Sequence, residues 1–203
     1  MKRHSNYLVW IDCEMTGLDP DRHVLLEIAT IITDNDLNIV AEGPVFAIRQ
    51  PESALKRMNN WCARTHARSG LLERVRTEGV SLRTAGKETL RFLRRHCRIR
   101  ASPLCGNSIG QDRRFLARYL PELHDFFHYQ SIDVSTVKQL VKRWYGRKYA
   151  APKKAGRHLA LHDIRESVAE LKHYRDRVFA RRARGKRQVG RKDRRSTEAL
   201  SPR

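Results

Sequence analysis

The sequence has 203 residues, a length that suits one domain or one domain with a tail, and its 40% of hydrophobic residues is enough for an ordinary globular core. The net charge of +20 favours polyanionic partners, with nucleic acid first and an acidic membrane surface second. No apolar run approaches the ~18 residues of a membrane span, and the run at 7–11 is too short for a signal peptide, so we expect a soluble, cytoplasmic protein.

The first third of the chain predicts three strands. Residues 7–12 are aromatic and β-branched and are followed by the turn-like pair Thr16-Gly17, which is typical of a buried strand. A second apolar run covers 24–33, and after a polar turn at 34–36 a third strand is predicted at 38–48. Two long strands joined by a short polar turn indicate an antiparallel hairpin.

The character changes at Pro51, and most of 51–98 is predicted to be helical. Apolar and small side chains recur there at helical spacing, with Arg and Lys on the other face: Leu82, Ala85, Thr89, Phe92 and His96. Short strands are predicted at 103–106 and 132–134. Helices alternating with strands after a hairpin indicate an α/β domain with a mixed sheet.

Three more helices complete the predicted domain. One follows Gly110, one is expected to be capped by Ser135, and the last is expected to begin near His162. The apolar periodicity stops after Phe179. We therefore predict a domain over 1–179, which carries +12 of the net charge, and a disordered basic tail over 180–203, which carries +8.

Four cysteines are scattered without a C-x-x-C pair, at Cys13, Cys62, Cys97 and Cys105. The spacing of a zinc site is therefore absent. Reduced, partly buried thiols are expected, which fits the cytoplasm.

Four acids stand out in this basic chain. Asp12 and Glu14 lie two residues apart at the end of the first strand, so both side chains point to one face. Like charges so close repel each other unless a cation neutralises them, and carboxylate oxygens suit Mg²⁺ or Mn²⁺. Asp112 and Asp163 each lie near the start of a predicted helix. Taken singly these are ordinary solvated acids, but together they form a set that can hold two metals ~4 Å apart.

Three motifs carry a resemblance to a known superfamily. They are I-D-C-E-M-T-G-L at 11–18, G-N-S-I-G-Q-D at 106–112 and H-L-A-L-H-D at 158–163. In order and spacing they resemble the DEDDh exonucleases, which have an RNase H-like fold. Within that superfamily, N-N-W-C-A-R-T-H-A-R-S-G-L at 59–71, H-Y-Q-S-I-D-V-S-T-V-K at 128–138 and D-I-R-E-S-V-A-E-L at 163–171 are similar to oligoribonuclease. The similarity runs from about 7 to 179.

The resemblance implies an RNase H-like mixed sheet flanked by helices and an activity on RNA. It implies that two divalent ions, Mg²⁺ or Mn²⁺, are bound by Asp12, Glu14, Asp112 and Asp163. His158 would be the general base, and a neutral imidazole with an ordinary pKa of ~6.5 suits that task. The expected reaction is 3′→5′ hydrolysis of RNA oligomers of about two to five nucleotides, dinucleotides especially, to 5′-mononucleotides.

The resemblance also implies a substrate clamp. Leu18 and Trp61 would pack against bases, His66 would hold the 3′-terminal end, and Ser108 would contact a phosphate. Without the resemblance, each of these residues would be interpreted as ordinary packing or surface.

A second subunit is expected to complete this clamp. Tyr129 would reach over from it and close the site, and Ser135 is expected to reach the phosphate from the same side. The resemblance thus implies a homodimer that shares its active sites.

Three positions depart from the family pattern. Asn59 stands where Asp is usual, Gln130 where Arg is common, and His162 where a second Asp is usual. Gln130 would weaken the grip on a 5′-phosphate. His162 places an imidazole beside a metal ligand, from which we expect a sharper loss of activity at acid pH, testable with His162→Asp.

Two alternatives stay open on the sequence. The first is another enzyme of the superfamily, either an RNA-trimming nuclease or a DNA-proofreading one; the W-x-x-x-T-H and Y-Q-S-I-D-V-S segments argue against it. The second is a non-catalytic, basic RNA-binding module. The retained cluster of mutually repelling carboxylates argues against that module.

Overall fold

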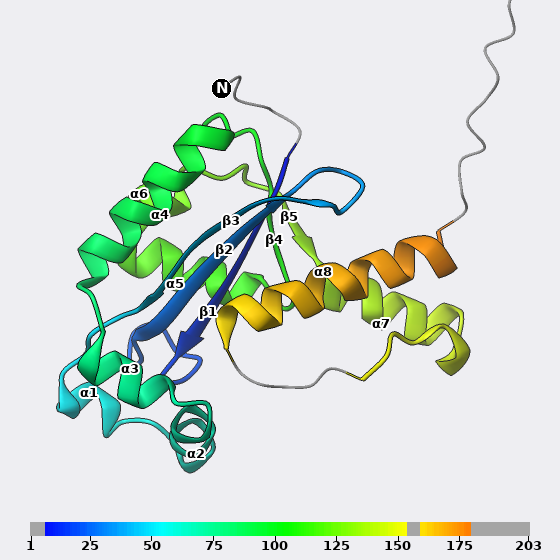
Figure 1. The fold of residues 1–203 in the computed structure, drawn as a ribbon. Coiled ribbons are helices and arrows are strands. Elements are labelled where there is room, and N and C mark those ends of the chain that lie inside the picture. Colours follow the sequence, from blue (N-terminus) through cyan, green and yellow to red (C-terminus); the bar gives the residue numbers. More distant parts are fainter. Residues whose placement is uncertain (1–6, 154–158, 180–203) are drawn as a thin grey trace, which may run out of the picture.

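The computed structural model describes residues 7–153 and 159–179. Its centre is a mixed five-stranded sheet with the order β3-β2-β1-β4-β5 (Figure 1). β1 to β3 form an antiparallel meander, while β4 and β5 run parallel to β1. The strands are β1 (Leu8–Met15), β2 (Leu25–Thr33), β3 (Ile39–Ala47), β4 (Leu104–Gly106) and β5 (Ser131–Asp133). The predicted α/β class and mixed sheet are confirmed.

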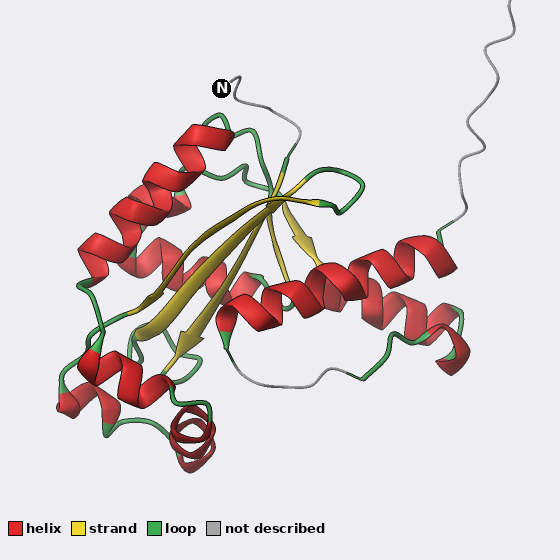
Figure 2. Ribbon diagram, viewed as in Figure 1, coloured by secondary structure: helices red, strands yellow, loops and turns green. Residues whose placement is uncertain are grey.

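Helices cover both faces of this sheet and one of its ends (Figure 2). One face carries α4 (Leu82–His96), α5 (Gly110–Tyr119) and the short α6 (Pro121–His124), and the other carries α7 (Val134–Trp144) and α8 (Ala160–Arg177). The end where β1 finishes carries α1 (Glu52–Leu55), α2 (Asn60–Arg68) and α3 (Leu71–Thr77) (Figure 1). A 3₁₀ turn, η1 (Arg147–Tyr149), follows α7.

The central strand β1 is sandwiched between two apolar clusters. Val9, Ile11 and Cys13 belong to the cluster under α4 and α5, whereas Trp10 belongs to the cluster under α7 and α8. The Trp10 indole donates a hydrogen bond to Thr33 Oγ1 at 3.0 Å, which satisfies its buried N–H. Since side chains alternate along a strand, Asp12 and Glu14 share the face of Trp10, which is the face of α8.

Two predicted element boundaries differ from the structure. β1 continues to Met15, so Asp12 and Glu14 lie within the strand, where they pair with Ala29 and Glu27 of β2. The predicted N-cap at Ser135 is wrong. Asp133 caps α7 by accepting a hydrogen bond from Ser135 N at 2.8 Å, which a carboxylate does at least as well as a hydroxyl.

Two further details refine the prediction. The last helix begins at Ala160 rather than near His162, and the short helix α6 was not expected. All four cysteines are buried. Among the described helices none is long and apolar enough to cross a membrane. The predicted tail at 180–203 lies outside the described residues, so the domain boundary at 179 stays a prediction.

Candidate active site

Three of the four singled-out acids meet beside the end of β1. Asp12 and Glu14 project from the strand, and Asp163 projects from the first turn of α8. One carboxylate oxygen of each lies within 4.8 Å of the others. The antiparallel β1–β2 pair and the α8 start thus bring together residues separated by about 150 positions in the sequence.

The fourth acid is held against the backbone of β1. Asp112 lies in the first turn of α5, and its Oδ1 accepts a hydrogen bond from Cys13 N at 2.9 Å. Cys13 stands between Asp12 and Glu14 in the strand, so Asp112 joins the set through the main chain that carries the first two. Its side chain is buried.

The electrostatics of this cluster are unfavourable without a cation. Burial, followed by the charges of Asp112, Glu14 and Asp163, raises the pKa of Asp12 well above its ordinary value. Burial and the neighbouring Asp163 and Glu27 raise the pKa of Glu14 to about 8. Burial also raises the pKa of Asp112 to about 7, against the lowering effect of the Cys13 amide. Together with Asp163, these three carboxylates form a donor set of the kind that a hard divalent cation neutralises.

A fifth carboxylate, Glu27 on β2, was missed by the sequence reasoning. It is 1% exposed, and it lies directly across from Glu14 in the β1–β2 pair. One oxygen accepts a hydrogen bond from Arg74 at 2.7 Å, and the other accepts one from Ala160 N at 2.8 Å. Glu27 therefore caps the start of α8, the helix that carries Asp163. The sequence did offer a hint of its role, because Glu27 is the one charged residue in the otherwise uncharged strand sequence at 25–33.

His66 is brought to the acidic cluster from α2. Its side chain is 2% exposed, with Nε2 at 2.9 Å from Met15 O and Nδ1 at 3.8 Å from Glu14 Oε2. The helix is started by Asn59, whose side chain accepts a hydrogen bond from Cys62 N at 2.8 Å. Asn59 therefore supplies the N-cap that Asp would supply, so this departure from the family pattern leaves α2 in place.

The residues expected to meet bases are large apolar side chains left exposed. Leu18 is 71% exposed in the β1–β2 loop, and Trp61 is 57% exposed on α2. Gln111, the neighbour of Asp112, donates from its side chain to the Leu18 carbonyl. That contact holds the β1–β2 loop beside the start of α5 and hence beside the acids.

Ser108 and Ser135 lie next to each other in one chain. Their Oγ atoms are 3.1 Å apart, and the backbone N–H groups of both donate to Asp133 Oδ1 at 2.9 and 2.8 Å. Ser108 adopts a positive φ of 52°, which this shared acceptor stabilises. We expected Ser135 to approach from a second subunit, whereas it borders Ser108 of its own chain.

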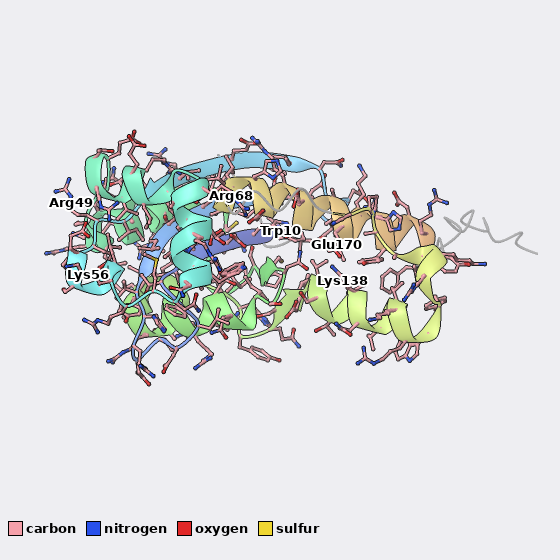
Figure 3. The ribbon with its side chains drawn as sticks, turned by 90° about the horizontal axis from the view of Figure 1, so that it is seen from below. Trp10, Arg49, Lys56, Arg68, Lys138 and Glu170 are labelled. Carbon is pink, nitrogen blue, oxygen red and sulfur yellow. The ribbon has the colours of Figure 1, made fainter. Side chains whose placement is uncertain are left out.

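A polar network behind this serine pair connects it to α8. Asn107 Oδ1 accepts from Ser135 Oγ at 3.1 Å, and Asn107 Nδ2 donates to Ser167 Oγ at 2.7 Å and to Glu170 Oε2 at 3.2 Å. Lys138 of α7 lies 3.2 Å from the buried Glu170 carboxylate (Figure 3). These contacts fix the loop after β4 between α7 and α8.

Tyr129 lies on the loop before β5 and is 79% exposed, so its ring is available to a ligand or to another chain. The neighbouring ring of His128 lies 4.4 Å away. Arg113, the residue after Asp112, donates to the carbonyls of His128 and Gln130 at 2.8 and 3.3 Å. This arginine, which the sequence did not single out, therefore connects the Tyr129 loop to the helix of Asp112.

The third motif is described from Leu159 to Asp163. His158 lies outside the described residues. His162 Nδ1 lies 3.6 Å from Glu166 Oε1, one turn further along α8. His162, Asp163 and Glu166 form a second group with ligand atoms within 4.8 Å, and Asp163 is common to both groups.

Comparisons with known proteins agree with this geometry. The family model RNase T, described as an exonuclease, matches residues 9–171. An oligoribonuclease from Marinobacter nauticus is 58% identical over 176 residues, which cover 87% of this chain and 98% of the relative. Oligoribonucleases from Pseudoalteromonas atlantica and Pseudomonas aeruginosa are 59% and 57% identical, over 85% and 83% of this chain and 95% and 94% of the relatives.

Solved structures share the fold at lower identity. The zinc-bound exonuclease I of E. coli in complex with single-stranded DNA superposes with a TM-score of 0.68 at 16% identity, over 86% of this chain and 41% of that one. Exonuclease I from Methylocaldum szegediense gives a TM-score of 0.64 at 18% identity, over 85% and 41%. The chain thus spans about 41% of the exonuclease I chains that it matches.

Proposed function

Because this chain belongs to the oligoribonuclease family of exonucleases, we propose that it hydrolyses very short RNA from the 3′ end, dinucleotides especially, and releases 5′-mononucleotides. We place this activity in the cytoplasm, where four buried thiols would stay reduced. The chain is a hydrolase of the nuclease class; the length of the substrate and the roles of single residues are the proposal.

The observation that carries the proposal is the meeting of Asp12, Glu14, Asp112 and Asp163 beside one strand. Hard oxygen donors in such a set fit Mg²⁺ or Mn²⁺, and burial, with like-charge repulsion, raises the pKa values of Asp12, Glu14 and Asp112, which a bound cation would offset. These four residues would hold two divalent ions. When bound, the ions supply charge stabilisation for the scissile phosphate and for the leaving 3′ oxygen.

The protein's own residues would prepare water and substrate for this chemistry. His158 would take the proton of the attacking water. His66, whose ring lies between the Met15 carbonyl and Glu14, would hold the 3′-terminal end. Ser108 and Ser135 would contact one phosphate together, because their two hydroxyl groups lie within hydrogen-bond distance of each other.

Exposed apolar side chains would pack against the bases. Leu18 is exposed on the loop held by Gln111, and Trp61 is exposed on the helix that carries His66, although residues of these types usually contribute to a core. Tyr129 of a second subunit would stack on a base and close the site, which makes a homodimer part of the proposal. A pocket closed in this way would exclude long strands, so the preference for very short RNA follows from its shape.

The test uses end-labelled RNA of two nucleotides and of about twelve nucleotides, with Mn²⁺ or with chelator. The matched variant is Asp112→Asn, which keeps an Oδ1 acceptor for the Cys13 amide but removes the charge. We expect fast, metal-dependent loss of the dinucleotide, slower loss of the longer RNA, and an inert variant.

Other outcomes identify the alternatives. Faster hydrolysis of the longer RNA would instead indicate an RNA-trimming or DNA-proofreading nuclease. Binding of RNA with no cleavage at any metal concentration would indicate the non-catalytic RNA-binding module that the net charge of +20 also allows.

A further inference from the structure

A cleft lies between α4 and the α5–α6 corner, on the face of the sheet that α8 does not cover. α4 and α6 lie side by side there (Figure 1). The cleft has a volume of about 290 Å³ and is lined by Leu82, Arg83, Gly86, Lys87, Leu90 and residues 119–123. Its walls are mainly apolar, and the Tyr119 ring is fixed because its hydroxyl donates to the carbonyls of Pro20 and His23 at 2.9 and 2.7 Å.

A row of cations borders this cleft along α4. We call it the basic stripe, and it consists of Arg83, Lys87, Arg91, Arg94 and Arg95, all exposed. Their spacing of mostly three or four residues places them within about a third of the helix circumference, over a length of about 18 Å. Ala85 and Leu93 on the other side of the helix are buried in the core.

The basic stripe is poorly compensated within the protein. Arg91 lies 3.0 Å from Glu88, but across residues 7–153 and 159–179 no carboxylate lies within ion-pair distance of Arg83, Lys87, Arg94 or Arg95. Like charges at this spacing destabilise a helix. Arg94 and Arg95 suit the carbonyl end of α4, whereas Arg83 lies in the first turn, where the helix dipole disfavours a cation and no acid is present. Helix stability therefore does not explain Arg83 and Lys87.

We propose that the basic stripe and the adjoining cleft bind single-stranded RNA outside the active site, with phosphates along the stripe and one base in the cleft. Guanidinium groups bind phosphates in a bidentate manner, and four of the five cations are arginine. Surfaces that bind single strands follow the backbone with a row of positive charge, and a stripe about 18 Å long can contact several successive phosphates. An apolar cleft with an immobilised tyrosine ring suits a nucleobase.

The charge pattern favours RNA over the other partners of a basic surface. A helix that enters a membrane surface needs an exposed apolar face, and the apolar face of α4 is packed against the sheet. Protein interfaces centre on aromatic and aliphatic anchors, whereas the stripe is cationic throughout. The surface would keep the protein on longer RNA, and it stands independently of the proposed activity.

The test compares two triple variants that each remove three positive charges. The stripe variant is Arg83→Gln, Lys87→Gln, Arg91→Gln; the scattered control is Lys142→Gln, Arg147→Gln, Arg177→Gln, at exposed positions on α7, η1 and α8. Glutamine keeps a good helix propensity. Binding of a fluorescent single-stranded RNA of about 16 nucleotides is measured on the full chain in chelator, between about 50 and 200 mM salt.

We expect the stripe variant to lose more affinity than the control and to flatten the dependence of log K on log salt by about 0.7 for each phosphate contact removed. Dinucleotide turnover should stay unchanged in both variants. Equal losses in the two variants would overturn the proposal, because only net charge would then matter. Slower dinucleotide turnover in the stripe variant alone would overturn the separation of this surface from the active site.

Two competitors test the chemistry of the ligand. Inorganic polyphosphate of matched charge carries no bases, so it should displace the labelled RNA less well than unlabelled RNA does. Equal displacement would overturn base binding in the cleft. Anionic phospholipid vesicles should displace little, and displacement equal to that by RNA would assign the stripe to a membrane surface instead.

Discussion

The acidic cluster beside β1 and the basic stripe on α4 are both sets of like charges, but they differ in burial. The acids are desolvated and close together, so their mutual repulsion appears as raised pKa values of Asp12, Glu14 and Asp112. The cations are exposed to water, which screens them. A buried cluster therefore requires a specific, tightly held counter-ion, whereas an exposed row attracts a polyanion loosely and in a salt-dependent manner.

The largest effect is expected where the buried cluster loses a charge. Asp112→Asn should reduce dinucleotide turnover by more than the roughly 10–100-fold that is typical of a residue just outside a metal's ligands. The folded structure should survive, because the amide oxygen can still accept the hydrogen bond of Cys13 N. Steady-state rates in Mn²⁺ together with thermal unfolding check both statements, and retained activity would contradict the assignment of Asp112.

The next effect concerns Glu27, which orients the buried cluster without belonging to it. Glu27→Gln should weaken activation by Mn²⁺ roughly 10–100-fold, because the cap on α8 and the pair with Arg74 both depend on this carboxylate. The measurement is a Mn²⁺ titration of turnover and of calorimetric binding. Glu78→Gln is the matched control, since Glu78 is exposed and lies 4.0 Å from the same arginine. Equal behaviour of the two variants would contradict a positioning role.

A smaller effect is expected at the rim of the active site. Trp61→Ala should lower kcat/KM for dinucleotides about tenfold, because stacking of one base contributes about 1–3 kcal/mol. Stability should change little, since the side chain is more than half exposed. Trp144→Ala on α7 is the control, as Trp144 is also largely exposed. A comparable loss in both variants would remove Trp61 from the clamp.

The pH dependence of stability sharpens the comparison further. The pKa of Glu14 is raised from 4.5 to about 8 and that of Asp112 from 3.8 to about 7, so the unfolded chain releases these protons first as pH rises. Metal-free protein should therefore lose stability between about pH 4 and pH 8. We expect Tm to fall by several degrees over this range, at roughly 2–4 °C per kcal/mol, and to recover with Mn²⁺. A Tm that is flat with pH in chelator would contradict this.

The smallest effect on turnover is expected from removal of the basic segment at the C-terminal end of the sequence. Removal of 181–203 should leave dinucleotide turnover nearly unchanged at physiological salt, because a basic tail attracts long RNA by electrostatics and contributes no specificity. Turnover of the full and shortened chains is compared at equal concentration. A large loss would show that the tail takes part in catalysis.

Local patterns predicted much of this fold, since strands and helices follow from the spacing of apolar residues. The apolar run at 24–33 corresponds to β2, and the helical spacing of apolar residues from Leu82 to Phe92 corresponds to α4. The choice of Asp133 over Ser135 as a cap depends on which side chain reaches the free amides, and both residue types are good caps. Composition cannot separate them.

The site was predictable only in part for a different reason. Asp12 and Glu14 share a face by the period of a strand, but the contact of Glu27 with Ala160 N joins positions 133 residues apart. Such a pair leaves no periodic trace in a single sequence. Arg113 likewise acts through a loop carbonyl, that of His128, and Asn107 acts through the Glu170 side chain on α8. Hydrogen bonds between residues far apart in the sequence could not be predicted, whereas most of the secondary structure could.

The short length of β4 has an evolutionary consequence. β4 pairs with β1 only at Val9 and Trp10, and further along β1 the amide of Cys13 is satisfied by Asp112 instead of by a strand. Replacement of Asp112 by an apolar residue would leave that buried amide without its acceptor, and the chain would lose stability together with activity. A descendant that abandons catalysis but still folds is therefore expected to keep a hydrogen-bond acceptor at position 112. An inactive paralogue with aspartate or asparagine there would fit this expectation.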